Sequence, residues 1–246
     1  MAKIEFKPGT MLNPVPAVMV SCGDETEQNI ITIAWTGIVN TDPPMTYISV
    51  RKERHSHDII ARTGEFVINL TTKDLAFATD YCGVRSGRKV DKFKEMDLTP
   101  AKSRKVSCPS IRESPVNLEC KVLDVREFPT HDMFLAEIIG VSVEESLMDE
   151  KGRLRLEDAG LIAYSHGSYV ALQHKELGTF GYSVMKPKTR RRIAAQKRQD
   201  NHARKAKQGD REGKYGKRPE APVRGQASRR NSSGRKKSHS PAKKIR

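Results

Sequence analysis

The segment PVNLECKVLDVREFPTHDMFLAEIIGVSVE, residues 115–144, decides the fold. From Val116 to Val122 apolar residues alternate with polar ones, which is the period of a strand with one buried and one wet face. The second half, residues 131–144, is also rich in apolar residues, and only the short connection PTHD separates the two halves. A connection of this length predicts an antiparallel hairpin of two long strands, 115–128 and 131–144.

Four shorter runs of β-branched and apolar residues lie upstream of this hairpin, separated by turn signals. They are VPAVMVSC (15–22), NIITIAWT (29–36), MTYISVR (45–51) and EFVINL (65–70). Such runs predict strands, whereas helical periodicity is confined to short stretches at 56–63 and 71–83 and near 90–96. A βαβ fold needs a crossover helix after nearly every strand. The pattern therefore favours a mainly β fold, an antiparallel barrel or sandwich with a few short helices.

Charge divides the chain into two parts. Residues 1–185 carry 22 Lys and Arg against 26 Asp and Glu, whereas residues 186–246 carry 23 against 4. The first part is long enough for one domain with a sizeable core. The second part has too few large hydrophobic side chains to offset the entropy of ordering it. We therefore predict one barrel domain over 1–185 and a disordered basic tail over 186–246.

The basic tail predicts attraction to polyanions. Its runs at 186–208 and 229–246 are diluted by polar residues, and Tyr215 is its one aromatic side chain. Non-specific contact with RNA or DNA is one interpretation, and it would be electrostatic because the tail lacks a platform for base stacking. A solubilising extension and contact with an anionic membrane surface are the alternatives.

The cysteines and the N-terminus indicate the compartment. Four scattered cysteines form no C-x-x-C pair, and MAKIEFKPG at the N-terminus has no apolar stretch, so nothing suggests secretion or disulfides. No run approaches the roughly 18 apolar residues of a spanning helix. We expect a cytoplasmic protein with no transmembrane segment. His55 and His57 would point to opposite sides of a strand, so we expect no metal site.

The stretch YISVRKERHSHDII, residues 47–60, runs from a strand into a cluster of cations and then into a helix. If Ser56 caps this helix, Arg51 at the strand end lies close to backbone N–H groups that have no intrahelical partner. A guanidinium beside a helix N-terminus makes an anion site suited to phosphate. The alternative is a solvated basic turn.

Five motifs in a fixed order carry a resemblance to a known family. They are NIITIAWTGIVNTDPPMTYISVR (29–51), SHDII (56–60), GEFVINL (64–70), DYCGVRSGRKVDKF (80–93) and THDMFLAEI (130–138). Over residues 8–184 the chain resembles the flavin reductase family with an FMN-binding split β-barrel, in particular its flavoredoxin-like branch. The basic tail is not part of the family pattern. The resemblance implies FMN as cofactor, with FAD left open, NADH or NADPH as co-substrate, and a homodimer that completes two flavin sites.

The resemblance also implies a set of cofactor-binding residues. The second strand would lie along the flavin ring system, and residues 49–51 with the helix start would approach the ribityl phosphate. The loop SGRKVDKF (86–93) would close over the cofactor, in many relatives from the partner subunit. For Trp35, core packing is the alternative role. The implied cofactor-binding residues are Thr32, Ile33, Ala34, Trp35, Ser49, Val50, Arg51, Ser56, Asn69, Ser86, Arg88 and Lys92.

Two histidines are the candidate catalytic residues. His131 matches a histidine that lies near the nicotinamide in some relatives, although Thr130 precedes it where an aspartate often stands. His166, in YSHGSY, is the second candidate for the flavin edge. No G-x-G-x-x-G follows a strand, so a nicotinamide would not be held by a Rossmann unit.

The function implied by the resemblance is hydride transfer from NAD(P)H to FMN. One alternative is a flavoredoxin-type electron carrier whose tightly bound FMN serves a protein or iron acceptor. The other is a nucleic-acid-binding protein that acts through its basic tail and uses the barrel as a scaffold.

Overall fold

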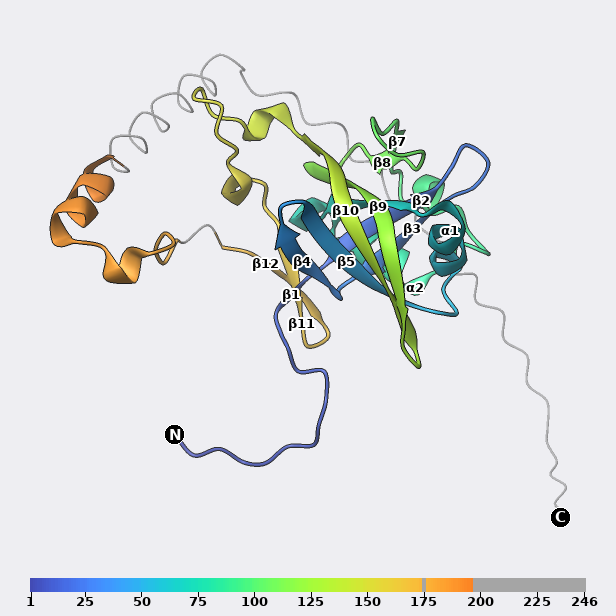
Figure 1. The fold of residues 1–246 in the computed structure, drawn as a ribbon, viewed down its shortest axis with the longest axis horizontal. Helices are drawn as coiled ribbons and strands as arrows, with labels where there is room; N and C mark the ends of the chain where they lie inside the picture. Colours follow the sequence, from blue (N-terminus) through green and yellow to red (C-terminus); the bar gives the residue numbers. More distant parts are fainter. Residues whose placement is uncertain (174–175, 197–246) are drawn as a thin grey trace, which may run out of the picture. The chain divides into compact units, whose positions relative to one another are not determined.

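The computed structural model describes residues 1–173 and 176–196. The chain divides into two compact units, Met1–Glu176 and Leu177–Arg246, each of which is described by itself. The first unit holds the strands and the short helices, as the ribbon in Figure 1 shows.

The first unit is built on a seven-stranded antiparallel sheet in the order β3-β2-β6-β9-β10-β5-β4. The predicted mainly β, antiparallel fold with few helices is thereby confirmed. The long hairpin is also confirmed, because β9 pairs antiparallel with β10 along most of its length. The strands are β1 (Val15–Pro16), β2 (Val18–Gly23), β3 (Gln28–Ile33), β4 (Thr36–Thr41), β5 (Pro44–Arg51), β6 (Glu65–Leu70), β7 (Pro100–Ala101), β8 (Ser110–Ile111), β9 (Val116–Glu127), β10 (His131–Val143), β11 (Ile162–Ser165) and β12 (Ser168–Ala171).

The two edges of this sheet are joined by two residues. β3 is one edge strand and β4 is the other, yet only Ala34 and Trp35 separate them in sequence. The amide of Ser49 on β5 donates a hydrogen bond of 2.9 Å to the carbonyl of Trp35, so the link itself is fastened to the far side of the sheet. The sheet thus curls into a barrel. The predicted strand 29–36 is wrong at its end, because the chain turns this corner after Ile33 and Thr36 already belongs to β4.

The core follows the two-residue period of the strands. In β2 and β3, Val20 and Ile31 point into an inner cluster with Phe66 and Phe134. Their neighbours, such as Met19, point the other way, into a second cluster formed with the helices. β2 is therefore buried on both faces, and this explains why its sequence reads as a continuous apolar run.

Three short helices border the barrel: α1 (His55–Thr63), α2 (Ala76–Val84) and α3 (Lys92–Glu95). α1 ends at Gly64, whose φ of 68° is the left-handed conformation that glycine adopts without strain. The prediction that Ser56 caps α1 is wrong. Arg54 occupies the N-cap position, and Ser56 lies inside the first turn with 1% of its surface exposed.

Short 3₁₀ segments and two small sheets complete the first unit. The 3₁₀ segments are Lys73–Leu75, Glu145–Leu147 and Leu156–Asp158. β11 and β12 form a hairpin on which β1 pairs, and β7 pairs with β8. None of these five short strands was predicted separately, because two to four residues are too few to show a period.

The described part of the second unit contains a 3₁₀ turn, Tyr182–Val184, and a helical stretch at 187–196. Disorder was predicted from residue 186, so this stretch departs from the prediction, whereas residues 197–246 lie outside the described residues. Among residues 1–173 and 176–196, no helix is both long and apolar enough to cross a membrane.

Candidate functional site

Two adjoining cavities in the first unit form one cleft. The smaller cavity has a volume of about 350 Å³ and the larger one about 440 Å³, and both are lined by Ile31 and Arg54. The smaller cavity is also lined by Asn29, Glu53, His55, Ser56, Arg85, Ser86, Gly87 and Lys92. The larger is also lined by Ala17, Thr32, Ile33, Ala34, Trp35, Ser49, Arg51, Asp80, Gly83, Val84, His131, Tyr164, Gly167 and Tyr169.

A buried cation lies at the smaller cavity. Lys92 is 4% exposed, and its Nζ donates hydrogen bonds to the carbonyls of Ile30 (2.6 Å) and Cys82 (2.8 Å). Among the described residues it pairs with no carboxylate. Desolvation lowers the pKa of Lys92 to about 8. An anion placed beside Lys92 would stabilise its charged form, because the attraction offsets the loss of water around the charge.

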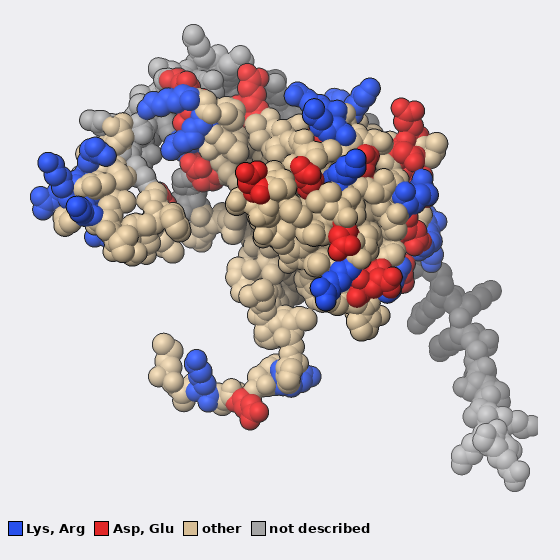
Figure 2. Space-filling view, in the orientation of Figure 1, with Lys and Arg blue, Asp and Glu red and all other residues tan. Residues whose placement is uncertain are grey.

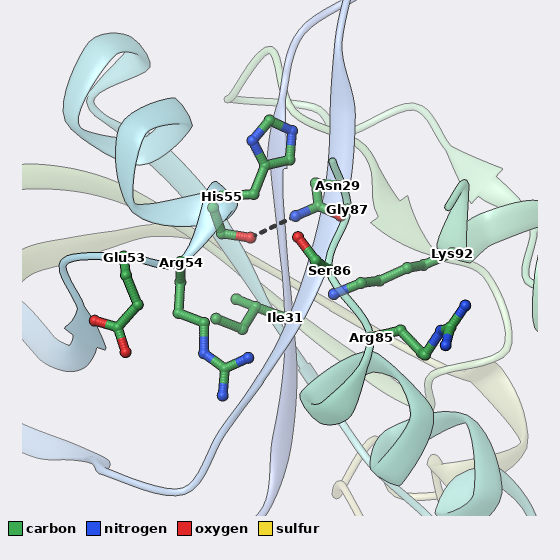
Figure 3. A pocket seen from close by; sticks show the side chains of 10 residues that line it. Asn29, Ile31, Glu53, Arg54, His55, Arg85, Ser86, Gly87 and Lys92 are labelled. Carbon is green, nitrogen blue, oxygen red and sulfur yellow. Dashed lines mark hydrogen bonds between the residues drawn. The ribbon is translucent and has the colours of Figure 1, made fainter. Parts of the chain in front are cut away.

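The start of α1 forms the opposite side of the same cavity. The first backbone N–H groups of a helix have no intrahelical partner, so they carry partial positive charge. Ser56 is oriented by the Asn29 amide, whose Nδ2 donates to the serine hydroxyl over 2.8 Å. Figure 3 shows these groups with Arg54 on one side and Lys92 reaching across towards β3. The cavity is suited to an anion, because three cations and the start of a helix line it, whereas Glu53 is the single carboxylate in its lining.

The larger cavity has an aromatic wall at the corner of the barrel. Trp35 lies against His131 with ring centroids 4.7 Å apart and planes inclined by 32°. The indole is 44% exposed, so its role is not core packing. Burial lowers the pKa of His131, and the guanidinium of Arg51, its cross-strand partner, lowers it further. His131 is therefore neutral near pH 7.

A second aromatic pair lines the same cavity from the β11–β12 hairpin. The rings of Tyr164 and Tyr169 meet edge to face at 5.3 Å. Burial raises the pKa of Tyr169 to about 12, and the nearby Asp80 carboxylate adds to the effect. With a second aromatic pair in its lining, the larger cavity suits a planar ring system.

Most of the cofactor-binding residues implied by the sequence meet in this cleft, but in two separate cavities. Arg51 lines the larger cavity and Ser56 the smaller one, and the two cavities adjoin at Ile31 and Arg54. Arg54 lines both cavities; it lies in the quoted stretch 47–60 but was not among the implied cofactor-binding residues. The implied residues that line the larger cavity are Thr32, Ile33, Ala34, Trp35, Ser49, Arg51 and His131, and those that line the smaller one are Ser56, Ser86 and Lys92.

Four implied residues lie elsewhere. Val50 is 1% exposed and packs in the inner cluster. Asn69 is fully buried, and its amide bonds the backbone and side chains of neighbouring strands. Arg88 bonds the carbonyl of Glu53 and does not line either cavity. His166, at the exposed tip of the β11–β12 turn, is also absent from the lining, where Gly167 stands instead.

A histidine–carboxylate pair does exist, but it involves a different histidine. Nε2 of His57 lies 2.8 Å from Oδ2 of Asp132, and Nζ of Lys52 lies 3.2 Å from Oδ1 of the same carboxylate. Burial acts to raise the pKa of Asp132, but the contacts with His57 and Lys52 outweigh it and hold the pKa below the ordinary value. This pair fastens the first turn of α1 to β10. No group of His, Cys, Asp or Glu that could hold a metal ion occurs within the described ranges.

Among the residues that line the cleft, the sequence analysis missed Asn29, Arg54, Asp80, Tyr164 and Tyr169. Arg54 stands two residues before Ser56 in a quoted motif, and that proximity was the available signal. Asn29 also lies in a quoted motif, but it is 27 residues from Ser56 in sequence and meets it only in the fold. Asp80, Tyr164 and Tyr169 also lie in quoted motifs, but their place in the cleft could not be predicted, because only the tertiary fold brings these segments to the barrel corner.

Comparisons with known proteins identify the family of the chain. Residues 11–173 match the family described as "Flavin reductase like domain". The flavoredoxin of Desulfovibrio vulgaris (Miyazaki F) is 28% identical, with a TM-score of 0.69 over 74% of this chain and 100% of that chain. Flavoredoxin from Methanosarcina acetivorans is also 28% identical, with a TM-score of 0.69 over 75% of this chain and 100% of that chain. A protein of Pyrococcus abyssi is 28% identical over 165 residues, which are 67% of this chain and 94% of that protein.

Proposed function

The chain belongs to the flavin reductase-like domain family, and on that basis we propose that it is an oxidoreductase that holds FMN in the two-cavity cleft. The observation that carries the proposal is the division of the cleft. One cavity is lined by aromatic and backbone groups and the other by cations, and a planar ring with a phosphate at the end of a short chain needs both.

The smaller cavity would take the phosphate. Lys92 and Arg54 would face it as cations, and Ser56 would offer its hydroxyl beside the first N–H groups of α1. The fit rests on the chemistry of the donors, because Lys92 is buried without a carboxylate partner among the described residues. Charge-assisted contacts of this kind are the stronger class of hydrogen bond.

The larger cavity would take the ring system. The backbone of residues 32–35 would border the ring, while Trp35 and His131 would cover it and exclude water. The hydroxyl of Thr32 is already used, because it donates to the carbonyl of Thr79. Hydrogen bonds to the ring from this strand would therefore come from backbone groups.

Bound flavin would supply hydride and single-electron chemistry. The chain's own residues would bind the flavin, orient it and keep water away. Arg51, at the edge of the larger cavity, would stabilise negative charge that develops on the ring, since it is a fixed cation close by. His131, neutral near pH 7, can accept or donate a hydrogen bond there. We propose NADH or NADPH as the electron donor.

The second candidate is an electron carrier with resident FMN. The similarity to two proteins named flavoredoxins, at 28% identity, favours it. The two candidates differ in whether the flavin leaves after reduction.

One experiment tests the proposal and separates the two candidates. The purified full-length chain is passed through gel filtration with and without FMN or FAD, and its absorbance spectrum and NAD(P)H oxidation are recorded. About one yellow equivalent per chain with slow NAD(P)H oxidation favours the carrier, and a colourless protein that reduces added FMN favours the reductase. A protein that neither takes up flavin nor reduces it would overturn the proposal. Lys92→Met should lose FMN, while the exposed control Lys89→Met should not.

We also propose that the protein forms a homodimer. Ile38 and Val39 on the edge strand β4 are 66% and 51% exposed, although consecutive strand residues point to opposite faces. Neither face of β4 is thus covered by the described part of this chain. Sedimentation velocity of the wild type and of Ile38→Asp tests this, with dimer and weakened dimer as the expected results and a wild-type monomer as the contrary one. Both Ser86 and Lys92 line the chain's own cavity, so they need no partner subunit.

A further proposal concerns the basic second unit, which we propose binds nucleic acid through its phosphates. Figure 2 shows basic side chains along the helical segment 187–196. Residues 186–196 contain five cations and no carboxylate, and the sequence beyond them continues the excess of Lys and Arg. An anionic membrane is less well matched, because this segment has only Ile193 as a large apolar side chain and offers no face to insert.

Fluorescence anisotropy with a labelled RNA oligomer tests this on the full chain. Affinity should fall linearly with salt on a log–log plot, with a slope of about −0.7 per phosphate neutralised. Replacing Arg190, Arg191 and Arg192 by Gln should weaken binding and reduce that slope. The control replaces three exposed cations of the first unit, Lys102, Arg104 and Lys105, and should change little. A salt-independent affinity would contradict the proposal.

A further inference from the structure

The smaller cavity lies between two lips that come from distant parts of the chain. One lip is residues 53–56 at the start of α1, and the other is residues 85–87, which follow α2. Among the described residues, the side chain of Arg88 joins them. Nη2 of Arg88 lies 2.6 Å from Oδ2 of Asp58, and Nη1 donates to the carbonyl of Glu53 over 3.1 Å. The guanidinium therefore ties the 85–87 lip to the turn before α1 and to its first turn.

The 85–87 lip packs tightly against the side chain of Asn29. A Cβ placed on Gly87 would lie 2.2 Å from Oδ1 of Asn29, the same amide that orients Ser56. The amide of Lys89 donates to the carbonyl of Ser86 over 3.0 Å, so the segment is itself a closed turn. The turn bond holds the 85–87 lip together, and Arg88 links it to the opposite lip.

The contacts of Arg88 argue against a direct role in binding an anion. Both ends of its guanidinium already bond the protein, one of them to a carboxylate. Asp58 lies in the first turn of α1, where an unpaired negative charge would repel a phosphate bound at the same helix start. Pairing with Arg88 neutralises that charge and holds the lips together.

We propose that Arg88 is a positioning residue that acts through Asp58 to keep the 85–87 lip closed over the anion cavity and so sets how long the phosphate end of FMN stays bound. This inference rests on the proposed function. It also explains how one cleft could serve a resident or an exchanging flavin, because the difference lies in the release rate. The Arg88 and Asp58 side chains are 49% and 59% exposed, so the pair is screened by salt, and its loss should speed release by about five-fold at most.

Release kinetics of the full-length protein test the proposal. FMN complexes of the wild type, Arg88→Gln, Asp58→Asn and the double variant are rapidly diluted, and the fluorescence of Trp35, which lines the larger cavity, reports release. Each single variant should release FMN about two- to five-fold faster, because an exposed ion pair contributes little free energy. The association rate constant should stay within about two-fold of the wild-type value. The double variant should be no faster than either single one. Arg62→Gln removes two ion pairs at the other end of α1, to Asp24 and Glu27, from a side chain that is 51% exposed, and should change nothing.

The Asp58 variant separates this proposal from direct binding. If Arg88 were a phosphate ligand, Asp58→Asn would remove a competing negative charge and slow the release of FMN. Slower release in Asp58→Asn, or unchanged release in Arg88→Gln, overturns the proposal while leaving FMN binding intact. The acceleration should also shrink at high salt, because an exposed ion pair is screened.

A measurement without flavin keeps the proposal testable if the wild type takes up no FMN. Amide hydrogen exchange over residues 85–91 of the free protein should be faster in both single variants and unchanged in Arg62→Gln. Unchanged exchange in Arg88→Gln overturns the lip closure itself, whereas failure of the wild type to take up flavin overturns the proposed function.

Discussion

The indole of Trp35 rests on the imidazole of His131, with ring centroids 4.7 Å apart, at the point where the chain passes from one edge of the barrel to the other. Trp35 is the only tryptophan of the chain, so its fluorescence reports on this one contact. Arg51 stands opposite His131 in the strand register and repels a proton on the imidazole.

The first prediction concerns the protonation of His131. Its pKa is lowered by burial and by Arg51, so Trp35 fluorescence should change on acidification with a midpoint below the ordinary value of about 6.5. Arg51→Gln should move the midpoint upwards, because a repelling charge is removed. His131→Gln should abolish the transition. A midpoint at or above 6.5 in the wild type would contradict the arrangement.

The second prediction concerns Lys92. Because its pKa is about 8 in the free protein, Lys92 loses its charge as the pH rises through that value, and a phosphate then loses a cationic partner. FMN affinity should therefore fall from pH 7 to pH 9, while the affinity for riboflavin, which has no phosphate, should stay constant. Lys92→Met should weaken FMN binding about 10- to 100-fold, from a charged hydrogen bond worth about 1.5–3 kcal/mol, and should remove this pH dependence. Isothermal titration calorimetry with FMN and with riboflavin at three pH values measures these affinities.

The third prediction concerns Asn69. Its amide accepts from the backbone N–H of Ile111 and the side chain of Asn117, so Asn69→Ala leaves buried donors unpaired. The free energy of unfolding should fall by about 2–4 kcal/mol, as measured with urea. Asn40→Ala, which removes an exposed amide bonded to the carbonyl of Pro43, should cost less than about 1 kcal/mol. FMN affinity of the folded protein should be unchanged by Asn69→Ala, and a specific loss of affinity would restore a cofactor role for Asn69.

The fourth prediction concerns Gly87. In Gly87→Ala the new Cβ would meet the Asn29 amide, which must then move and give up its bond to Ser56. FMN affinity should fall by about ten-fold, the equivalent of one hydrogen bond of about 1.4 kcal/mol, while riboflavin affinity changes less. Gly9→Ala, where the nearest atom is 3.9 Å from the new Cβ, is the matched control. Equal loss for both flavins would place the effect outside the phosphate cavity.

The fold was largely predictable because its long elements carry a clear period. The hairpin of β9 and β10 and the strands β2, β5 and β6 were expected within a few residues of their bounds. β4 was missed, because the apolar run before it continues through Trp35 without a break in composition. Only the return of the chain to pair with β5 defines that corner.

The site was predicted in part, and the failures have one physical origin. Local sequence places Arg51 and Ser56 near a helix start, but it cannot tell which side of a strand end faces which cavity. The side chain of Asn69 was assigned by position in a motif, although its polar atoms are consumed by strands 40 or more residues away in sequence. Long-range partners of this kind decide whether a polar residue is free to bind a ligand.

The joint at Ala34 and Trp35 limits how this scaffold can be redesigned. These residues close the barrel and border the larger cavity at once, so lengthening or shortening the chain there would open the sheet along with the pocket. Room for new substrates has to come from the β11–β12 turn and the 85–91 loop, which lie outside the seven-stranded sheet and can change length without unravelling it.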